Sequence, residues 1–285
     1  MTIKRRDFLG QVAAGSAVVS MPAFLSGCGV QQATQVAEPT PDNPFMTWFG
    51  IDEATIARVM AELSANGADT ADLYFQHQRT NNLSMEDGIV SRANSGISQG
   101  VGLRVVIGEQ TGYAFTEDLT LDSMLAAART AAAIARGTAV VAPQSYNAKR
   151  TGDLYTMAMP WSDVGIDRKL PILQQVEAYA RQADPAIQKV SVNWADADDR
   201  VLIATLDGHL IMDHRPMTRL SAFLTASRDG ETQSGYSNIA ARQDFSWYNE
   251  ARIKTMVDEA VDRTMILFEA KRPPAGEMPV ILAAG

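Results

Sequence analysis

The sequence predicts an α+β fold, in which two successive α+β domains have antiparallel sheets and flanking helices. Three observations lead to this class. Apolar residues recur with helical spacing near the start and the end of each half of the chain. Runs rich in β-branched and aromatic residues lie between them, and Asp-Gly pairs separate several of these runs. A helix, several strands and another helix in that order indicate a sheet with helices on one face.

The first domain is expected between residues 48 and 137. It begins with a helix that Asp52 can cap and Gly67 can end. The apolar residues of this helix recur at helical spacing: Ile56, Val59, Met60 and Leu63.

Short strands are expected next in this domain. They occupy residues 72–76, 82–86, 89–93, 100–107 and 111–115. The pairs Asp87-Gly88 and Gly108-Glu109 provide hairpin turns between them. A second helix, capped by Thr120, completes the domain.

A connector at residues 138–160 precedes the second domain, which is expected at residues 161–272. Its first helix is predicted over residues 168–182, with Pro171 in the first turn, where proline is tolerated. The predicted strands are 190–194, 201–206, 210–214 and 218–227, with turns at Asp207-Gly208 and Asp229-Gly230. A last helix is predicted over residues 250–270.

The N-terminus has the pattern of an export signal. Residues 4–9 read KRRDFL, a twin-arginine pair followed by an aromatic residue and a leucine, and no charge falls between Phe8 and Leu25. The stretch ends in Leu25-Ser26-Gly27-Cys28, which is typical of a lipobox. We therefore predict a twin-arginine lipoprotein signal at residues 1–28, with Cys28 acylated and facing the periplasm or the cell exterior. The alternative is a short transmembrane anchor with an incidental cysteine.

Residues 29–47 are rich in Gln, Thr and Pro and are expected to form a flexible tether. A formal net charge of −8 argues against a nucleic-acid-binding protein, which needs cations to neutralise phosphates. Cys28 is the only cysteine, so no intramolecular disulfide can form and stability must come from a packed core.

Several usual catalytic and metal motifs are absent from the sequence: HExxH, CxxC and the Walker loop. The three histidines are His77, His209 and His214. His77 is expected at a strand end on the surface. His209 and His214 are five residues apart, so on one strand they would point to opposite faces, which disfavours a shared metal.

Two further patterns are better explained by structure than by chemistry. Glu86 and Asp87 could form an acid–base pair, but adjacent strand residues face opposite sides and Asp87 already has a turn role. Gly100, Gly102 and Gly108 do not form a phosphate loop, because no helix is predicted to begin at them.

Several segments, taken together, resemble the TldD/PmbA family. They are GADTADLY at 67–74, SMEDGIV at 84–90, QGVGLRV at 99–105, TGYAFT at 111–116, DHRP at 213–216, RDG at 228–230 and GY at 235–236. Their order and spacing, rather than any one of them, carry the resemblance. It covers roughly residues 52–285 and is stronger to the TldD side.

The resemblance implies a metallopeptidase, a hydrolase that degrades or trims unfolded peptides and acts with a TldE/PmbA-like subunit or as a dimer of itself. It also implies zinc, held in a C-terminal β-rich domain by an HExxxH helix and a later cysteine. Residues 273–285 look like the start of that domain, with a first strand at 278–285, and no HExxxH follows. No catalytic or metal residue can therefore be assigned in this chain, which we predict to be an inactive fragment alone.

The leading hypothesis is the N-terminal portion of an exported TldD-like metallopeptidase, which shapes the substrate chamber and the subunit interface. Exposed strand edges at 84–88 and 99–105 could hold an extended peptide by β-augmentation. The candidate substrate-binding residues are Glu86, Gln99, Gly100 and Arg104. The alternative is a non-catalytic lipoprotein that binds peptides or a partner subunit.

Overall fold

The structure is a computed structural model that describes residues 43–135, 142–150, 154–155, 157–272 and 274–283. The predicted signal at 1–28, with Cys28, and the tether as far as residue 42 lie outside the described residues. Within the described part of the chain, no helix combines the length and the apolar character that a membrane crossing requires.

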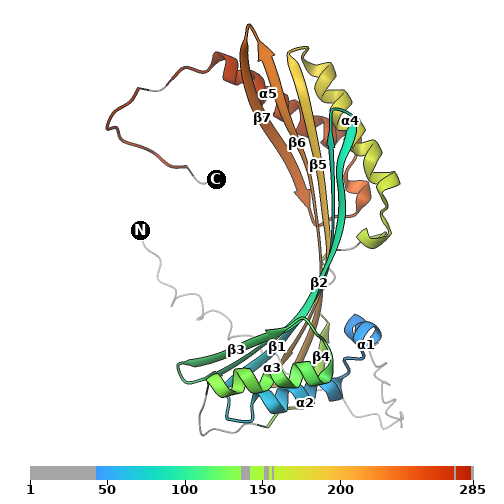
Figure 1. Cartoon of the computed structure of the whole chain (residues 1–285), viewed down its shortest axis with the longest axis vertical. Helices are drawn as coiled ribbons and strands as arrows, with labels where there is room; N and C mark the ends of the chain where they lie inside the picture. Colours follow the sequence, from blue (N-terminus) through green and yellow to red (C-terminus); the bar gives the residue numbers. More distant parts are fainter. Residues whose placement is uncertain (1–42, 136–141, 151–153, 156, 273, 284–285) are drawn as a thin grey trace, which may run out of the picture. The chain divides into compact units, whose positions relative to one another are not determined.

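One seven-stranded sheet, almost entirely antiparallel, forms the centre of the fold (Figure 1). Its order is β3-β2-β1-β5-β6, and both β4 and β7 pair with β6. The strands are β1 Thr70–Glu86, β2 Ile89–Ile107, β3 Gln110–Thr116, β4 Asn147–Arg150, β5 Ile187–Thr205, β6 His209–Arg228 and β7 Glu231–Ala241. The expected α+β class with antiparallel strands and flanking helices is confirmed.

Four strands are about twice as long as predicted, which corrects the strand assignments. The expected strands at 72–76 and 82–86 are both parts of β1, and those at 89–93 and 100–107 are both parts of β2. The same holds for β5 and β6. The polar residues between the apolar runs do not break the strands, because they contain no turn and the ladder continues through them. The two expected sheets are therefore one sheet.

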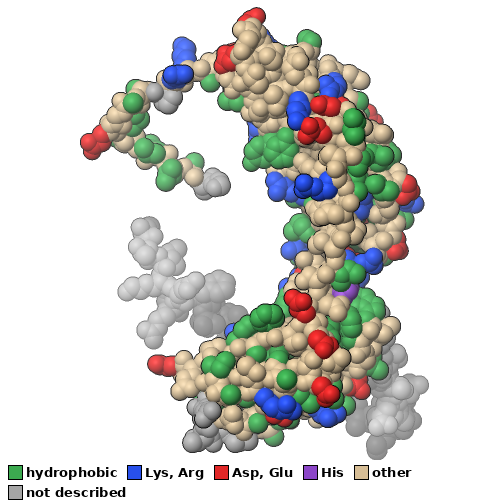
Figure 2. Space-filling view, in the orientation of Figure 1, with side chains coloured by type: hydrophobic (Ala, Val, Ile, Leu, Met, Phe, Trp, Pro, Cys, Tyr) green, Lys and Arg blue, Asp and Glu red, His purple; other side chains and the backbone are tan. Residues whose placement is uncertain are grey.

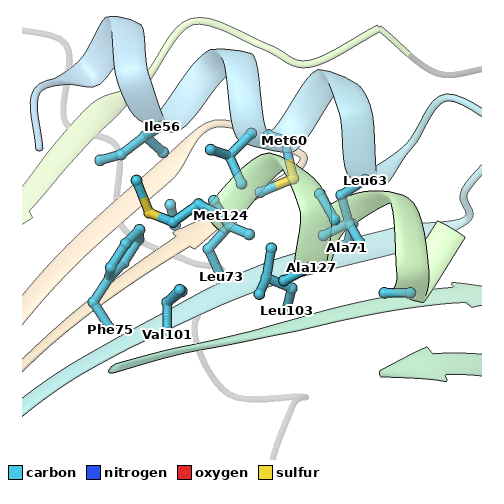
Figure 3. Packing of buried hydrophobic residues seen from close by; sticks show 14 of the residues in the cluster. Ile56, Met60, Leu63, Ala71, Leu73, Phe75, Val101, Leu103, Met124 and Ala127 are labelled. Atoms are coloured by element: carbon cyan, nitrogen blue, oxygen red, sulfur yellow. The ribbon is translucent and has the colours of Figure 1, made fainter. Parts of the chain in front are cut away.

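Two hydrophobic cores lie on the same face of this sheet. Figure 3 shows the first core, in which Leu73 and Phe75 of β1 pack against helices α2 and α3. Leu83 and Met85, at the other end of β1, belong to the second core with α4 and α5. All four residues are odd-numbered positions of one continuous strand, so both helix pairs cover one face. The long strands thus pass through both cores.

The helices begin and end close to where the sequence signals them. Their bounds are α1 Pro44–Phe49, α2 Glu53–Leu63, α3 Leu121–Ile134, α4 Ile166–Ala183 and α5 Glu250–Met265. Asp52 caps α2 by accepting a hydrogen bond from the Thr55 N–H at 2.7 Å, as predicted. Helix α4 begins two residues early, so Pro171 lies beyond the first turn, where its missing N–H removes a helical hydrogen bond.

Four segments differ from expectation. Helix α1 occupies the end of the expected tether, because Asn43 caps it and buried Phe45 anchors it in the first core. β4 lies inside the expected connector, and β7 was not predicted. The strand expected at 278–285 does not form in residues 278–283, which have no neighbouring strand to pair with in the described structure and are exposed.

Candidate functional site

The sheet face opposite the helices, which we call the open face, carries the even-numbered residues of β1 and their cross-strand neighbours. Among the described residues, every α-helix contributes buried hydrophobic side chains to one of the two cores on the other face. Figure 2, which has the orientation of Figure 1 and does not view the open face directly, shows hydrophobic side chains beside charged ones at the surface of both halves of the molecule. An uncovered sheet face of this size is a candidate binding surface.

A groove of 560 Å³ lies on the open face over the first half of the sheet. We call it the aromatic groove, because Tyr113 and Phe115 of β3 line it and are 56% and 68% exposed. Gly100 and Gly102 of β2 form part of its floor. A methyl group on Gly102 would contact the Tyr113 hydroxyl at 3.0 Å, so glycine leaves room for the ring to lie across the strand.

Charged and polar groups lie along the aromatic groove. The Nε of Arg104 donates to Asp72 at 2.8 Å, which holds the guanidinium against the groove wall. Gln76 donates to both carboxylate oxygens of Asp199 at 3.0 Å. Burial raises the pKa of Asp199, and the hydrogen bond from Gln76 only partly offsets this effect. The groove thus combines exposed rings with fixed polar groups, a composition that suits an amphipathic ligand.

The structure brings three of the four sequence-predicted residues together. Gln99, Gly100 and Arg104 all line the aromatic groove. Glu86 lies at the far end of β1, where it forms an ion pair with Lys189 at 2.6 Å. Sequence reasoning missed the exposed rings of β3, although the alternation of Tyr113 and Phe115 within a short strand was a usable signal.

Of the two expected exposed edges, only residues 99 and 100 lie at an unpaired edge in the described structure. Residues 84–86 belong to β1, which has β2 on one side and β5 on the other, so both edges are occupied. Residues 101–105 pair with β3. In the described structure, residues 89–100 of β2 pair only with β1, and we call their other side the open edge. The exposed edges were misplaced because the sequence does not reveal which strands are neighbours. The strand order depends on contacts between residues far apart in sequence.

The described residues contain no cluster of three or more His, Cys, Asp or Glu side chains that could hold a metal. His209 and His214 lie on opposite faces of β6, as their odd spacing predicts. The Nε2 atom of His214 lies 2.6 Å from Asp198. His77 does not end a strand; it lies in the middle of β1, and its ring lies against the Trp48 ring with centroids 4.7 Å apart and an interplanar angle of 46°.

The pair of Asp198 and His214 predicts a pH-dependent stability. Burial alone would raise the pKa of Asp198, but the hydrogen bond and charge of His214, with Arg200, hold it below its usual value. A lowered carboxylate pKa stabilises the fold above the unfolded pKa of about 3.9, and this contribution is lost as the pH falls through the folded value. We expect Asp198→Asn to lower the free energy of unfolding by about 1–3 kcal/mol at pH 7 and by much less near pH 3.

Urea unfolding at both pH values measures this difference. Glu109→Gln, an exposed turn substitution, is the control and should have little effect at either pH. An equal loss from Asp198→Asn at pH 7 and pH 3 would show that its ionised form does not stabilise the fold.

Comparisons with known proteins agree with this architecture. Residues 71–135 match the family model described as PmbA/TldA metallopeptidase domain 1, and residues 160–268 match the PmbA/TldA metallopeptidase central domain. Together these matches cover more than half of the chain.

Curated relatives and solved structures extend the match. The metalloprotease TldD homologue of Haemophilus influenzae is 30% identical over 250 residues, covering 85% of this chain and 52% of that protein. The homologue from Buchnera aphidicola subsp. Acyrthosiphon pisum is 25% identical over 242 residues, covering 82% of this chain and 50% of that protein. The chain therefore spans about half the length of these relatives.

Two crystal structures have the same fold. One is a Thermotoga maritima protein named as a modulator of DNA gyrase, with a TM-score of 0.62 and 18% identity over 79% of this chain and 50% of that chain. The other is TldE from Thermococcus kodakarensis, with a TM-score of 0.54 and 13% identity over 73% of this chain and 46% of that chain. With the two family-model matches, the sheet and its helices identify this chain as a member of the PmbA/TldD metallopeptidase family.

Proposed function

We propose that this chain is the N-terminal portion of an exported, membrane-anchored TldD-like metallopeptidase that degrades or trims unfolded peptides. Family membership supports the peptidase class. The twin-arginine and lipobox patterns before Cys28 support export and anchoring by lipid. In this proposal the chain shapes the substrate chamber and contributes to contacts with a partner, either a TldE-like subunit or a second copy.

Zinc does not fit the described residues, because they include no cluster of metal-ligating side chains. We therefore derive no catalytic step from this portion, and we propose that any zinc site is formed by residues outside it. The contribution of the described residues is to bind and orient the peptide.

The observation that carries the proposal is the position of the aromatic groove beside the open edge of β2. An extended peptide added along residues 89–100 would lie in line with β3, because β3 occupies the same side of β2 from Val101 onward. Main-chain hydrogen bonds at such an edge recognise the backbone rather than the sequence. The rings of Tyr113 and Phe115 would then contact apolar side chains of any peptide with little selectivity. This combination suits an enzyme of broad specificity.

A peptidase assay tests this proposal. We expect the polypeptide extended through the coding sequence that follows residue 285 to cleave an unfolded peptide with zinc and to lose that activity with a chelator. We expect residues 1–285 alone to be inactive under the same conditions. Cleavage by residues 1–285, or inactivity of the extended chain together with its partner subunit, would refute the proposal.

The double variant Tyr113→Ser/Phe115→Ser tests the groove in the same assay. We expect it to raise KM about tenfold or more and to leave kcat within about twofold, because the loss is one of uniform binding. Folding should be nearly unaffected, since both rings are largely exposed. Ile134→Ser on α3 is the matched control, because Ile134 is also exposed but lies outside the groove. An unchanged KM in the double variant would exclude the groove from substrate binding.

The second candidate is a non-catalytic lipoprotein that binds peptides or a partner subunit. The open edge of β2 favours it equally, because main-chain pairing requires no catalytic residue. Tight peptide binding by an extended chain that never cleaves would support this candidate.

A further inference from the structure

We propose that a second hollow on the open face binds an extended peptide that carries two carboxylates. The hollow has a volume of 480 Å³ and lies over the second half of the sheet. We call it the arginine pocket, because Arg92 of β2 and Arg219 of β6 line it from opposite sides. The inference concerns binding alone and does not depend on peptidase activity.

The strand register places the two arginines across a floor of small polar residues. Arg92 lies opposite Ser84 on β1, and Ser84 lies opposite Asn193 on β5. Arg219 on β6 lies opposite Ala195, which is two residues further along β5 than Asn193 and on the same face of the sheet. None of these intervening side chains is long enough to fill the space between the two guanidinium groups, so the pocket stays open.

The lining of the arginine pocket lacks acidic residues. Amide, hydroxyl and small side chains and the ring of Phe223 surround the two arginines: Asn82, Ser84, Asn94, Asn193, Ala195, Ser221 and Phe223. Trp194 also lines the pocket, but its side chain is buried in the second core on the other face. Neither arginine forms an ion pair with a described residue. By contrast, Arg104 and Arg215 in the other half of the open face are paired with Asp72 and Asp213. In a chain with a net charge of −8, two unpaired arginines facing one hollow indicate an anionic ligand.

The spacing of the two arginines favours a peptide over a small anion. Three inter-strand spacings separate β2 from β6, and the two arginines are also offset by two residues along the strands. Their Cα atoms therefore lie about 16 Å apart. A single phosphate can reach both guanidinium groups only if both side chains turn fully inward. Carboxylates two to four residues apart on an extended chain span about 7–14 Å, which matches arginines that reach partway toward each other. Arginine also binds carboxylates through two parallel hydrogen bonds.

An apolar margin completes the pocket and suits a peptide side chain. The ring of Phe223 lines the pocket and stacks on Tyr236 at 5.4 Å, with an interplanar angle of 18°. Both rings are partly exposed on the open face. We therefore assign the pocket to an extended peptide with two acidic residues and an adjacent apolar residue, rather than to a nucleic acid, whose phosphates the acidic chain would repel.

Fluorescence anisotropy on the full chain in detergent tests this assignment. The probe is a labelled peptide with two Glu residues four positions apart and one Leu, and its twin carries Gln at both Glu positions. We expect the Glu peptide to bind about tenfold or more tightly than the Gln twin at low salt, and the difference to shrink as salt rises. Equal binding of the two peptides would overturn the proposal.

Variants locate the binding on the arginine pocket. We expect Arg92→Gln/Arg219→Gln to weaken binding of the Glu peptide about tenfold or more and each single variant to weaken it by less. Arg58→Gln on α2 is the matched control, because it removes one exposed positive charge from the helix layer. An unchanged Kd in the double variant, or an equal loss in Arg58→Gln, would overturn the assignment. Inorganic phosphate or a DNA oligonucleotide, added at the same concentration of negative charge as the Glu peptide, should not displace that peptide. Displacement by either would also overturn the assignment.

Discussion

Lys169→Met is expected to lower the free energy of unfolding by about 3–5 kcal/mol. The Nζ atom of Lys169 on α4 lies 2.5 Å from the Oδ2 atom of Asp196 on β5, and the two side chains are only 6% and 1% exposed. Asp196 also accepts hydrogen bonds from the Trp194 indole at 2.8 Å and the Asn81 amide at 2.7 Å. Without Lys169, the carboxylate would be buried with neutral donors only, and an uncompensated buried charge is costly.

Urea denaturation of the wild-type protein and of Lys169→Met at neutral pH measures this loss of stability. Lys254→Met is the matched control, because Lys254 pairs with Asp258 on α5 and both are more than half exposed. We expect that control to change stability by about 0.5 kcal/mol or less. The double variant Lys169→Met/Asp196→Asn should recover part of the loss, since it removes the buried charge. Equal effects of Lys169→Met and Lys254→Met would contradict the role of the buried pair.

Gly112→Ala is expected to lower the free energy of unfolding by about 3 kcal/mol, near the upper end of the usual cost of overpacking. Gly112 lies on β3, where the strand meets helix α3. A methyl group there would overlap the carbonyl oxygen of Ala131 on α3 and come within 3.1 Å of Val105 on β2. The overlapping atom belongs to the backbone, so relief requires α3 to move away from the sheet.

Thermal unfolding followed by circular dichroism tests this expectation. Gly96→Ala on β2 is the matched control, because its added methyl group would meet only the Thr80 hydroxyl at 3.3 Å. We expect the control to change stability by about 1 kcal/mol or less, since alanine is otherwise no worse than glycine in a strand. Similar melting temperatures for the two variants would show that α3 is not seated as closely as the structure indicates.

The turns were predictable because their chemistry is local. Asp87-Gly88 and Asp229-Gly230 were assigned as hairpin turns, and all four residues adopt positive φ, from 47° to 82°. These values belong to the type I′ turn, which matches the twist of the strands it joins. The helices were predictable for the same reason, since periodicity and capping residues such as Asp52 act within a few positions.

Part of the candidate site was also predictable. Gln99, Gly100 and Arg104 were chosen within segments that carry the family resemblance, and all three line the aromatic groove. Glu86 was chosen on the same basis but lies at the other end of β1. A strand of 17 residues places its two ends far apart, and the sequence did not show that the two halves of β1 are one strand.

The sequence alone therefore determined the α+β class, the turns, most helix boundaries and the family, because each depends on local propensity or on the order of short motifs. Only the tertiary structure decided that one sheet runs through both cores, that the open edge lies at residues 89–100, and that Lys169 meets Asp196. It also placed Arg92 and Arg219 around one pocket. These features depend on strand order and register, which are set by contacts between residues far apart in sequence, so no local pattern could reveal them.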